Sequence, residues 1–140
     1  DVSEQVTVGG SPRDLVVDTT GRIWFSNWGS SVLNVYDPET GTTTVAPAGV
    51  EEPHHFTLGP DGSVWVSDNG GSAVVRFSDG VATSVEVGPT PHHLAFAGDI
   101  LVVAVSGSGE AVLVEDGQVI ARVPLSTGLH GVTVVEIPSD

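Results

Sequence analysis

The chain has 140 residues, of which 18 are acidic and four are arginine or lysine, and its net charge is −14. A field of this sign repels phosphate backbones and anionic membranes, so it excludes nucleic-acid binding, and no apolar run is long enough for a membrane-spanning helix. The absence of cysteine excludes disulfides, thiol catalysis and cysteine-based zinc sites. An acidic chain without lysine or cysteine favours a secreted, extracytoplasmic protein. With 39% hydrophobic residues and 18 glycines, the composition predicts a globular all-β fold.

The elements expected in chain order are a lone strand over residues 4–8 and then a series of repeats. Residues 12–36 align with residues 53–77 without a gap, at an offset of 41, and further copies begin at Pro91 and Leu129. The identical pairs are Pro12 and Pro53, Gly21 and Gly62, Trp24 and Trp65, Ser26 and Ser67, Gly29 and Gly70, and Ser31 and Ser72. Repetition at this period indicates one supersecondary unit per repeat.

Each repeat contains four short apolar segments separated by glycine, aspartate and asparagine turns. In the second repeat the expected strands cover 55–58, 64–67, 73–77 and 83–87. Four antiparallel strands every 40 residues or so are typical of a β-propeller blade. The sequence therefore predicts one partial propeller, with blades over about 11–49, 50–88 and 89–127 and lone strands at 4–8 and 131–137. The strand order is then d, three times abcd, and a.

A three-bladed segment leaves two sheet faces uncovered. Propellers have roughly four to eight blades, so both terminal blades of this chain expose apolar surface. We expect a second copy of the chain, or a complementary chain, to complete the ring.

The segment Pro53–Asp68 resembles the repeat of the virginiamycin B (streptogramin) lyases and is similar to the wider NHL-repeat propellers. The glycine usual at the second position after proline is replaced by Asp14, His55 and His93, and it survives as Gly131. The resemblance implies a propeller fold. For the lyases it implies histidines and a glutamate around a magnesium ion at the channel mouth, and for the related peptide-amidating lyase it implies zinc.

Three histidines occupy the same place in successive repeats: His54, His92 and His130, with Arg13 at that place in the first repeat. A repeat architecture turns equal sequence position into rotation about one axis, so these side chains should converge at one mouth of the channel. Imidazole nitrogens suit divalent metals, so the three histidines are the predicted ligands of zinc or magnesium. Polar channel residues that bind water are the alternative. Strand alternation predicts that His55 and His93 point away.

Two further side chains complete the predicted ligand site. Trp28 lies in the turn after the second strand, where Asn69 is its counterpart, so the repeat does not require an aromatic residue there. Arg13 can anchor a carboxylate or pair with Asp14. The predicted function is binding of a ligand or partner at a histidine-lined mouth. The alternative is a metal-dependent lyase, for which His92 and His130 are the catalytic candidates.

Overall fold

Three four-stranded antiparallel sheets form the computed structural model, which describes residues 5–46 and 49–125. The first sheet contains β1 (Pro12–Val17), β2 (Ile23–Asn27), β3 (Leu33–Asp37) and β4 (Thr42–Val45). The second contains β5 (Pro53–Leu58), β6 (Val64–Asp68), β7 (Ala73–Ser78) and β8 (Val81–Glu86). The third contains β9 (Pro91–Ala97), β10 (Ile100–Val105), β11 (Glu110–Glu115) and β12 (Gln118–Pro124). The described residues form no helix, so the predicted all-β partial propeller is confirmed.

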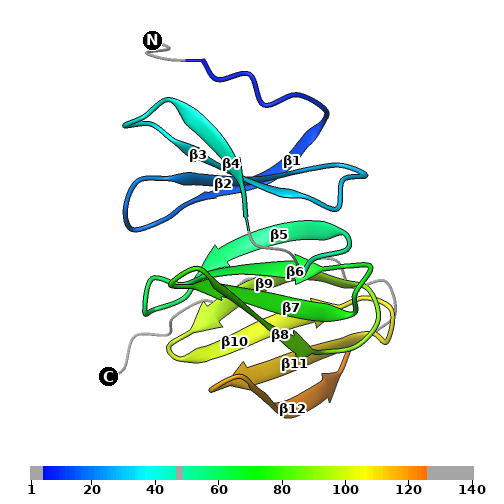
Figure 1. Ribbon diagram of the computed structural model, residues 1–140. Coiled ribbons are helices and arrows are strands. Elements are labelled where there is room, and N and C mark those ends of the chain that lie inside the picture. Colours follow the sequence, from blue (N-terminus) through cyan, green and yellow to red (C-terminus); the bar gives the residue numbers. More distant parts are fainter. Residues whose placement is uncertain (1–4, 47–48, 126–140) are drawn as a thin grey trace.

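The three sheets follow one another along the molecule as successive blades (Figure 1). In each sheet the strands are paired in chain order, and the first strands of neighbouring sheets, β1, β5 and β9, lie next to one another. These three strands are therefore the inner strands that line the channel side. The beginnings of β1, β5 and β9 come together at one end, where the site described below is found.

Tight turns set the limits of the strands. Gly21 and Gly62 occupy the same place in the turn after the first strand of their blades, and both have a φ of +84°. The hairpins that join β7 to β8 and β11 to β12 both use an Asp-Gly pair, in which Asp79 and Asp116 have a φ of +50°. Two left-handed residues in succession twist the chain as a two-residue β-hairpin requires.

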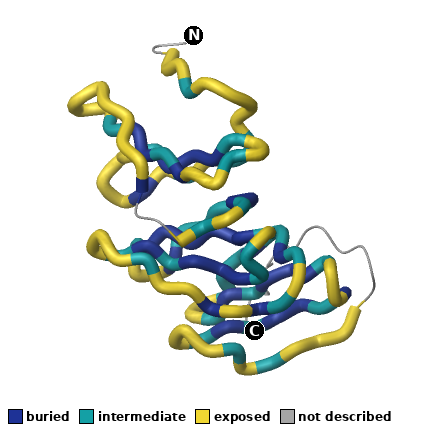
Figure 2. Tube along the Cα trace, turned by 45° about the vertical axis from the view of Figure 1, so that its right-hand side comes forward, coloured by how far each residue is buried: buried dark blue, intermediate teal, exposed yellow. Residues whose placement is uncertain are grey.

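The hydrophobic core lies between the blades (Figure 2). Trp24 belongs to the cluster that joins the first two blades, and Trp65 belongs to the cluster that joins the second and third. Both indoles are buried, as their place in the second strand predicts. Burial of these large aromatic rings against the neighbouring sheet holds successive blades together.

The ends of the described chain carry less regular structure. Residues 5–8, within the predicted lone strand at 4–8, form no strand, because no described strand of an adjoining blade is there to pair with them. The predicted strand at 131–137 lies outside the described residues. Over the described residues, no helix is long and apolar enough to cross a membrane.

Candidate functional site

Side chains from three successive blades meet where the inner strands begin. Arg13 on β1 donates a hydrogen bond from Nη2 to Nδ1 of His54 on β5, over 2.9 Å. The ring of His54 meets that of His92 on β9 edge to face, with 4.6 Å between the ring centroids. The structure thus brings together three of the four residues that share this repeat position. His130, the fourth, lies outside the described residues.

The second histidine of each pair also belongs to this cluster, and the prediction that His55 and His93 point away from it is wrong. The rings of His55 and His93 are stacked, with 3.7 Å between their centroids. His55 also lies 6.0 Å from His92, measured between ring centroids. The pairing of β5 with β6 shifts register between Pro53 and Phe56. An irregularity of this kind interrupts the strict alternation of side chains, so successive histidines reach the same side.

Asp14 orients His55. The carboxylate Oδ2 of Asp14 lies 3.3 Å from Nδ1 of His55 and accepts a hydrogen bond from the backbone N–H of Phe56, over 2.9 Å. Burial alone would raise the pKa of Asp14, but the hydrogen bonds from His55 and from backbone N–H groups outweigh it and lower that pKa. An ionised carboxylate only accepts hydrogen bonds, so Nδ1 of His55 carries a proton, and in the neutral imidazole the lone pair lies on Nε2. Arg13 forms no ion pair with Asp14 within the described residues, contrary to one reading of the sequence.

His54 is the most deeply buried of the described histidines, with 4% of its surface exposed. Burial, then the positive charge of Arg13 and the neighbouring imidazoles, lower the pKa of His54 to about 4. His54 is therefore neutral near pH 7, and since Nδ1 accepts from Arg13, its proton lies on Nε2. That nitrogen is 3.8 Å from Oε1 of Glu52. Nδ1 of His54 is thus occupied by Arg13, and His54 can bind a metal through that nitrogen only if this hydrogen bond breaks.

Trp28 covers the guanidinium group of Arg13. The Cζ atom of Arg13 lies 4.2 Å from the ring centroid of Trp28, and this tryptophan is 62% exposed. The two residues form a cation–π pair at the surface end of the histidine cluster. The aromatic residue that the repeat does not require is therefore placed beside the histidines, where a ligand can reach it.

The imidazoles are close enough to suggest a metal site. Among the described residues, His54, His55 and His92 each offer a nitrogen, and these nitrogens lie within 4.8 Å of one another. Nitrogens bound to one zinc ion are about 3–4 Å apart, so small side-chain rotations would bring the set onto one ion. A carboxylate that orients a ligating histidine, as Asp14 orients His55, is the usual partner of a metal-bound imidazole. The donors fit a divalent transition metal, and His55, which was predicted to point away, is one of the three.

Sequence reasoning missed the roles of Asp14, His55 and Glu52. One signal was present in the sequence, because Asp14, His55 and His93 all replace the glycine expected at the second position after proline. Three polar substitutions at one repeat position indicate a shared environment. The direction in which they point could not be read from the alternation rule, because the strand is irregular at that place.

The fold is that of a β-propeller, and the comparison with solved structures agrees. No family model matches the sequence, and no curated protein matches it. Among solved structures, a catalytically inactive virginiamycin B lyase from Staphylococcus aureus with quinupristin is similar over 91% of this chain and 46% of that chain, with 18% identity and a TM-score of 0.75. Kuenenia stuttgartiensis hydrazine synthase is similar over 92% and 40%, with 19% identity and a TM-score of 0.71. A nidogen/laminin complex is similar over 89% and 52%, with 14% identity and a TM-score of 0.71.

These comparisons define a virginiamycin B lyase-like β-propeller fold, which confirms the predicted resemblance at the level of fold. The chain spans about half the length, or less, of the solved propellers that it matches. It is thus a partial propeller. At identities below 20% the likeness concerns the fold alone, and the function has to be argued from the site.

Proposed function

We propose that this chain is the binding segment of a larger β-propeller and that its histidine-lined mouth binds a divalent transition-metal ion. One observation carries the proposal: His54, His55 and His92, from two blades, offer nitrogens within 4.8 Å of one another. Folds with repeated blades place such groups around an axis without any need for them to be near in sequence.

The three histidines differ in how readily each could bind a metal ion. His55 is the best prepared, because Asp14 holds its Nδ1 proton and leaves Nε2 to donate to a metal. His92, which contacts the rings of both His54 and His55, supplies the second imidazole. His54 is held by Arg13, so it joins the ion only after that hydrogen bond breaks. This order predicts that His55 and His92 matter most for affinity, and that removal of Arg13 frees His54 and tightens binding.

Calorimetric titration of the chain with Zn²⁺ tests the proposal. We expect one ion per chain, a loss of binding in His55→Gln and His92→Gln, and binding weakened about 10–100-fold in Asp14→Asn, because the orienting carboxylate is lost. Arg13→Gln should tighten binding, because it frees Nδ1 of His54. Arg122→Gln is its matched control, since it removes the same charge from β12, the outermost strand of the third blade. Unchanged zinc affinity in both histidine variants would contradict the proposal.

We further propose that a second copy, or a complementary chain, completes the ring. Leu15 and Val17 on β1 are 60% and 49% exposed, and Ile120 and Val123 on β12 are 49% and 43% exposed. Apolar side chains of this size at both ends of a blade series favour association. Light scattering should give a mass above 14.3 kDa, and Leu15→Glu should lower it. A monodisperse particle of 14.3 kDa would rule out self-association.

A metal-dependent lyase is the second candidate, favoured by the similarity in fold to the virginiamycin B lyase whose structure was solved with quinupristin. A bound ion would polarise the substrate and stabilise negative charge. The residues of this chain would orient the substrate, to which Trp28 would offer an aromatic surface. His92 would be the candidate acid or base where His54 and His55 hold the ion, because an imidazole nitrogen bound to the metal cannot take up a proton. His54 is a poor base near pH 7 because its pKa is about 4. Incubation of the zinc- or magnesium-loaded chain with quinupristin, followed by mass spectrometry, tests this activity; an intact substrate argues for the binding function.

A further inference from the structure

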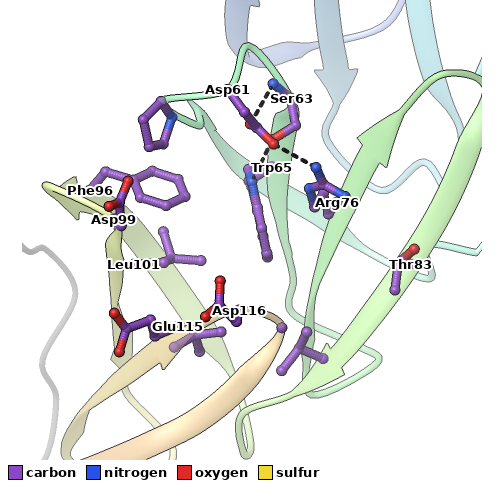
Figure 3. Close-up of a pocket in the computed structure, with 14 residues that line it drawn as sticks. Asp61, Ser63, Trp65, Arg76, Thr83, Phe96, Asp99, Leu101, Glu115 and Asp116 are labelled. Atoms are coloured by element: carbon purple, nitrogen blue, oxygen red, sulfur yellow. Dashed lines mark hydrogen bonds and ion pairs between the residues drawn. The ribbon is translucent and has the colours of Figure 1, made fainter.

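A cleft between the second and third blades lies far from the histidines. Pro60 and Asp61, at one side of it, follow the end of β5, whereas His54 lies at the beginning of the same strand. The cleft has a volume of about 730 Å³ and opens to the surface (Figure 3). This volume is within the range of about 300–1,000 Å³ that is usual for small-molecule sites.

The floor of the cleft is aromatic and aliphatic. The rings of Trp65 and Phe96 meet edge to face with 5.8 Å between their centroids, and Leu101 and Val114 continue the apolar surface. The indole N–H of Trp65 donates to Oγ of Ser63 over 3.0 Å, so it needs no partner from a ligand. Trp65, Leu101 and Val114 are nearly fully buried, so the partly buried ring of Phe96 offers most of the apolar contact in the floor.

The rim of the cleft is acidic. Four carboxylates and a single arginine line it, and that arginine, Arg76, is already paired with Asp61 over 2.6 Å. Within the described residues, Asp99, Glu115 and Asp116 make no side-chain hydrogen bond or ion pair. Figure 3 shows the carboxylate of Asp116 directed between Leu101 and Trp65, and Asp99 beside the ring of Phe96. Uncompensated negative charge thus borders an apolar surface.

The equivalent cleft between the first and second blades differs in how many of its carboxylates are paired. It is smaller, about 390 Å³, and two of its three carboxylates are paired with other side chains of the protein. Asp18 accepts hydrogen bonds from Trp24 and Arg22, and Asp61 is held by Arg76. Asp79, the counterpart of Asp116 in the Asp-Gly hairpin, is the third. Among the residues that the structure describes, the smaller cleft therefore has one carboxylate without a side-chain partner, Asp79, whereas the larger cleft has three, Asp99, Glu115 and Asp116.

We propose that the cleft between the second and third blades binds an organic ammonium ion with an apolar body. The apolar part packs on Phe96, where that ring meets Trp65, and the cation lies between Asp99 and Asp116. A cation over an aromatic face and close to carboxylates gains from both attractions, and the net charge of −14 draws cations to the surface. A neutral or anionic ligand of the same shape lacks these gains.

Calorimetric titration with phenethylamine tests the proposal, with 2-phenylethanol as the neutral ligand of similar shape. We expect the alcohol to bind at least about fivefold more weakly than the amine. Asp99→Asn and Asp116→Asn should each weaken amine binding about two- to fivefold. Asparagine tolerates the left-handed backbone of residue 116, so Asp116→Asn keeps the turn. Asp79→Asn is the matched control, since it makes the same change in the equivalent hairpin of the other cleft.

The result is independent of the metal site. His92→Gln should leave amine binding unchanged, so loss of zinc binding and loss of amine binding are separable. Raising the salt concentration should weaken the amine and leave the alcohol unaffected, because only the amine depends on charge. Equal affinity for amine and alcohol, or an Asp79→Asn effect as large as that of Asp116→Asn, would overturn the proposal. So would an absence of binding at about 10 mM amine in low salt, where charge attraction is strongest.

Discussion

The first two blades place a tryptophan at the same position of the second strand, yet they satisfy its indole N–H in different ways. In the first blade Trp24 donates to Oδ2 of Asp18 over 2.9 Å. In the second blade Gly59 stands where Asp18 would be, and Trp65 donates to Oγ of Ser63 over 3.0 Å. The hydroxyl of Ser63 donates in turn to Asp61, over 2.5 Å.

The two solutions exclude one another. A Cβ atom added at Gly59 would lie 2.6 Å from Oγ of Ser63 and 2.8 Å from Oδ1 of Asp61, so an aspartate there would displace the serine network. Repeats of this kind therefore preserve the geometry of the buried indole and its need for an acceptor, while the residue that accepts can change. The difference also alters the surface, since Asp18 is buried and the side chain of Asp61 is 55% exposed.

The largest effect is expected from removing the tryptophans themselves. Trp24→Ala and Trp65→Ala should each lower the free energy of unfolding by about 3–5 kcal/mol, because each leaves a cavity between two blades. Urea denaturation followed by circular dichroism measures this cost. A cost below about 1 kcal/mol for either variant would show that its blade interface is not a packed core.

A smaller effect separates Asp18, which accepts from its tryptophan directly, from Asp61, which accepts from Ser63. Asp18→Ala leaves the buried N–H of Trp24 without a partner and should cost about 1–3 kcal/mol. Asp61→Ala removes an ion pair with Arg76 and two hydrogen bonds from Ser63, but the Asp61 side chain is 55% exposed, so water can replace these contacts and the cost should be about 1 kcal/mol or less. The same urea experiment compares them, and a reversed order would contradict the assignment of Asp18 as the buried acceptor.

The buried carboxylate of Asp18 should make the stability of the protein depend on pH in the acid range. Burial alone would raise the pKa of Asp18, but hydrogen bonds from Trp24, Thr20 and Arg22 outweigh it and lower that pKa to about 2. An unfolded aspartate has a pKa near 3.9, so the stabilisation is present above about pH 4 and is lost as the pH falls to about 2. Unfolding measured across this window should become less pH-dependent in Asp18→Asn. An unchanged profile would show that Asp18 is not the group that titrates.

The smallest expected effect is on the pKa of His54. His54 and Arg13 occupy the same repeat position in the second and first blades. The folded pKa of His54 is about 4 and the unfolded value is near 6.5, so protons bind the unfolded chain preferentially between these values. Stability should therefore decrease as the pH falls from about 6.5 to about 4. Arg13→Gln removes a nearby positive charge and should raise the pKa of His54, which NMR titration of the imidazole measures. A His54 pKa that stays at its original value would contradict the contact.

Much of the fold was predictable from residues 12–36 and 53–77. The repeated proline, glycine and tryptophan positions established the blades, and the buried state of Trp24 and Trp65 followed from their place in the second strand. The meeting of His54 with His92 was also predicted, because equal repeat positions lie around one axis. These predictions rest on spacing along the chain, which a repeat converts directly into position.

Less of the candidate site was predictable, because side-chain direction depends on local register. The irregular pairing of β5 with β6 brings His55 into the cluster, where alternation predicted that it would point away. The partners of the imidazoles, Asp14 for His55 and Arg13 for His54, come from the neighbouring blade, about 41 residues earlier, and no local pattern reveals them.

Spacing and turn chemistry along the chain were thus sufficient to establish the blades, their order and the ring position of the histidines. The packing of one blade against the next settled which nitrogen of His54 and of His55 is engaged, and which carboxylates are buried or remain at an open cleft. The physical reason is that turns and strand pairing are local, whereas burial and charge pairing depend on the atoms that a neighbouring blade supplies.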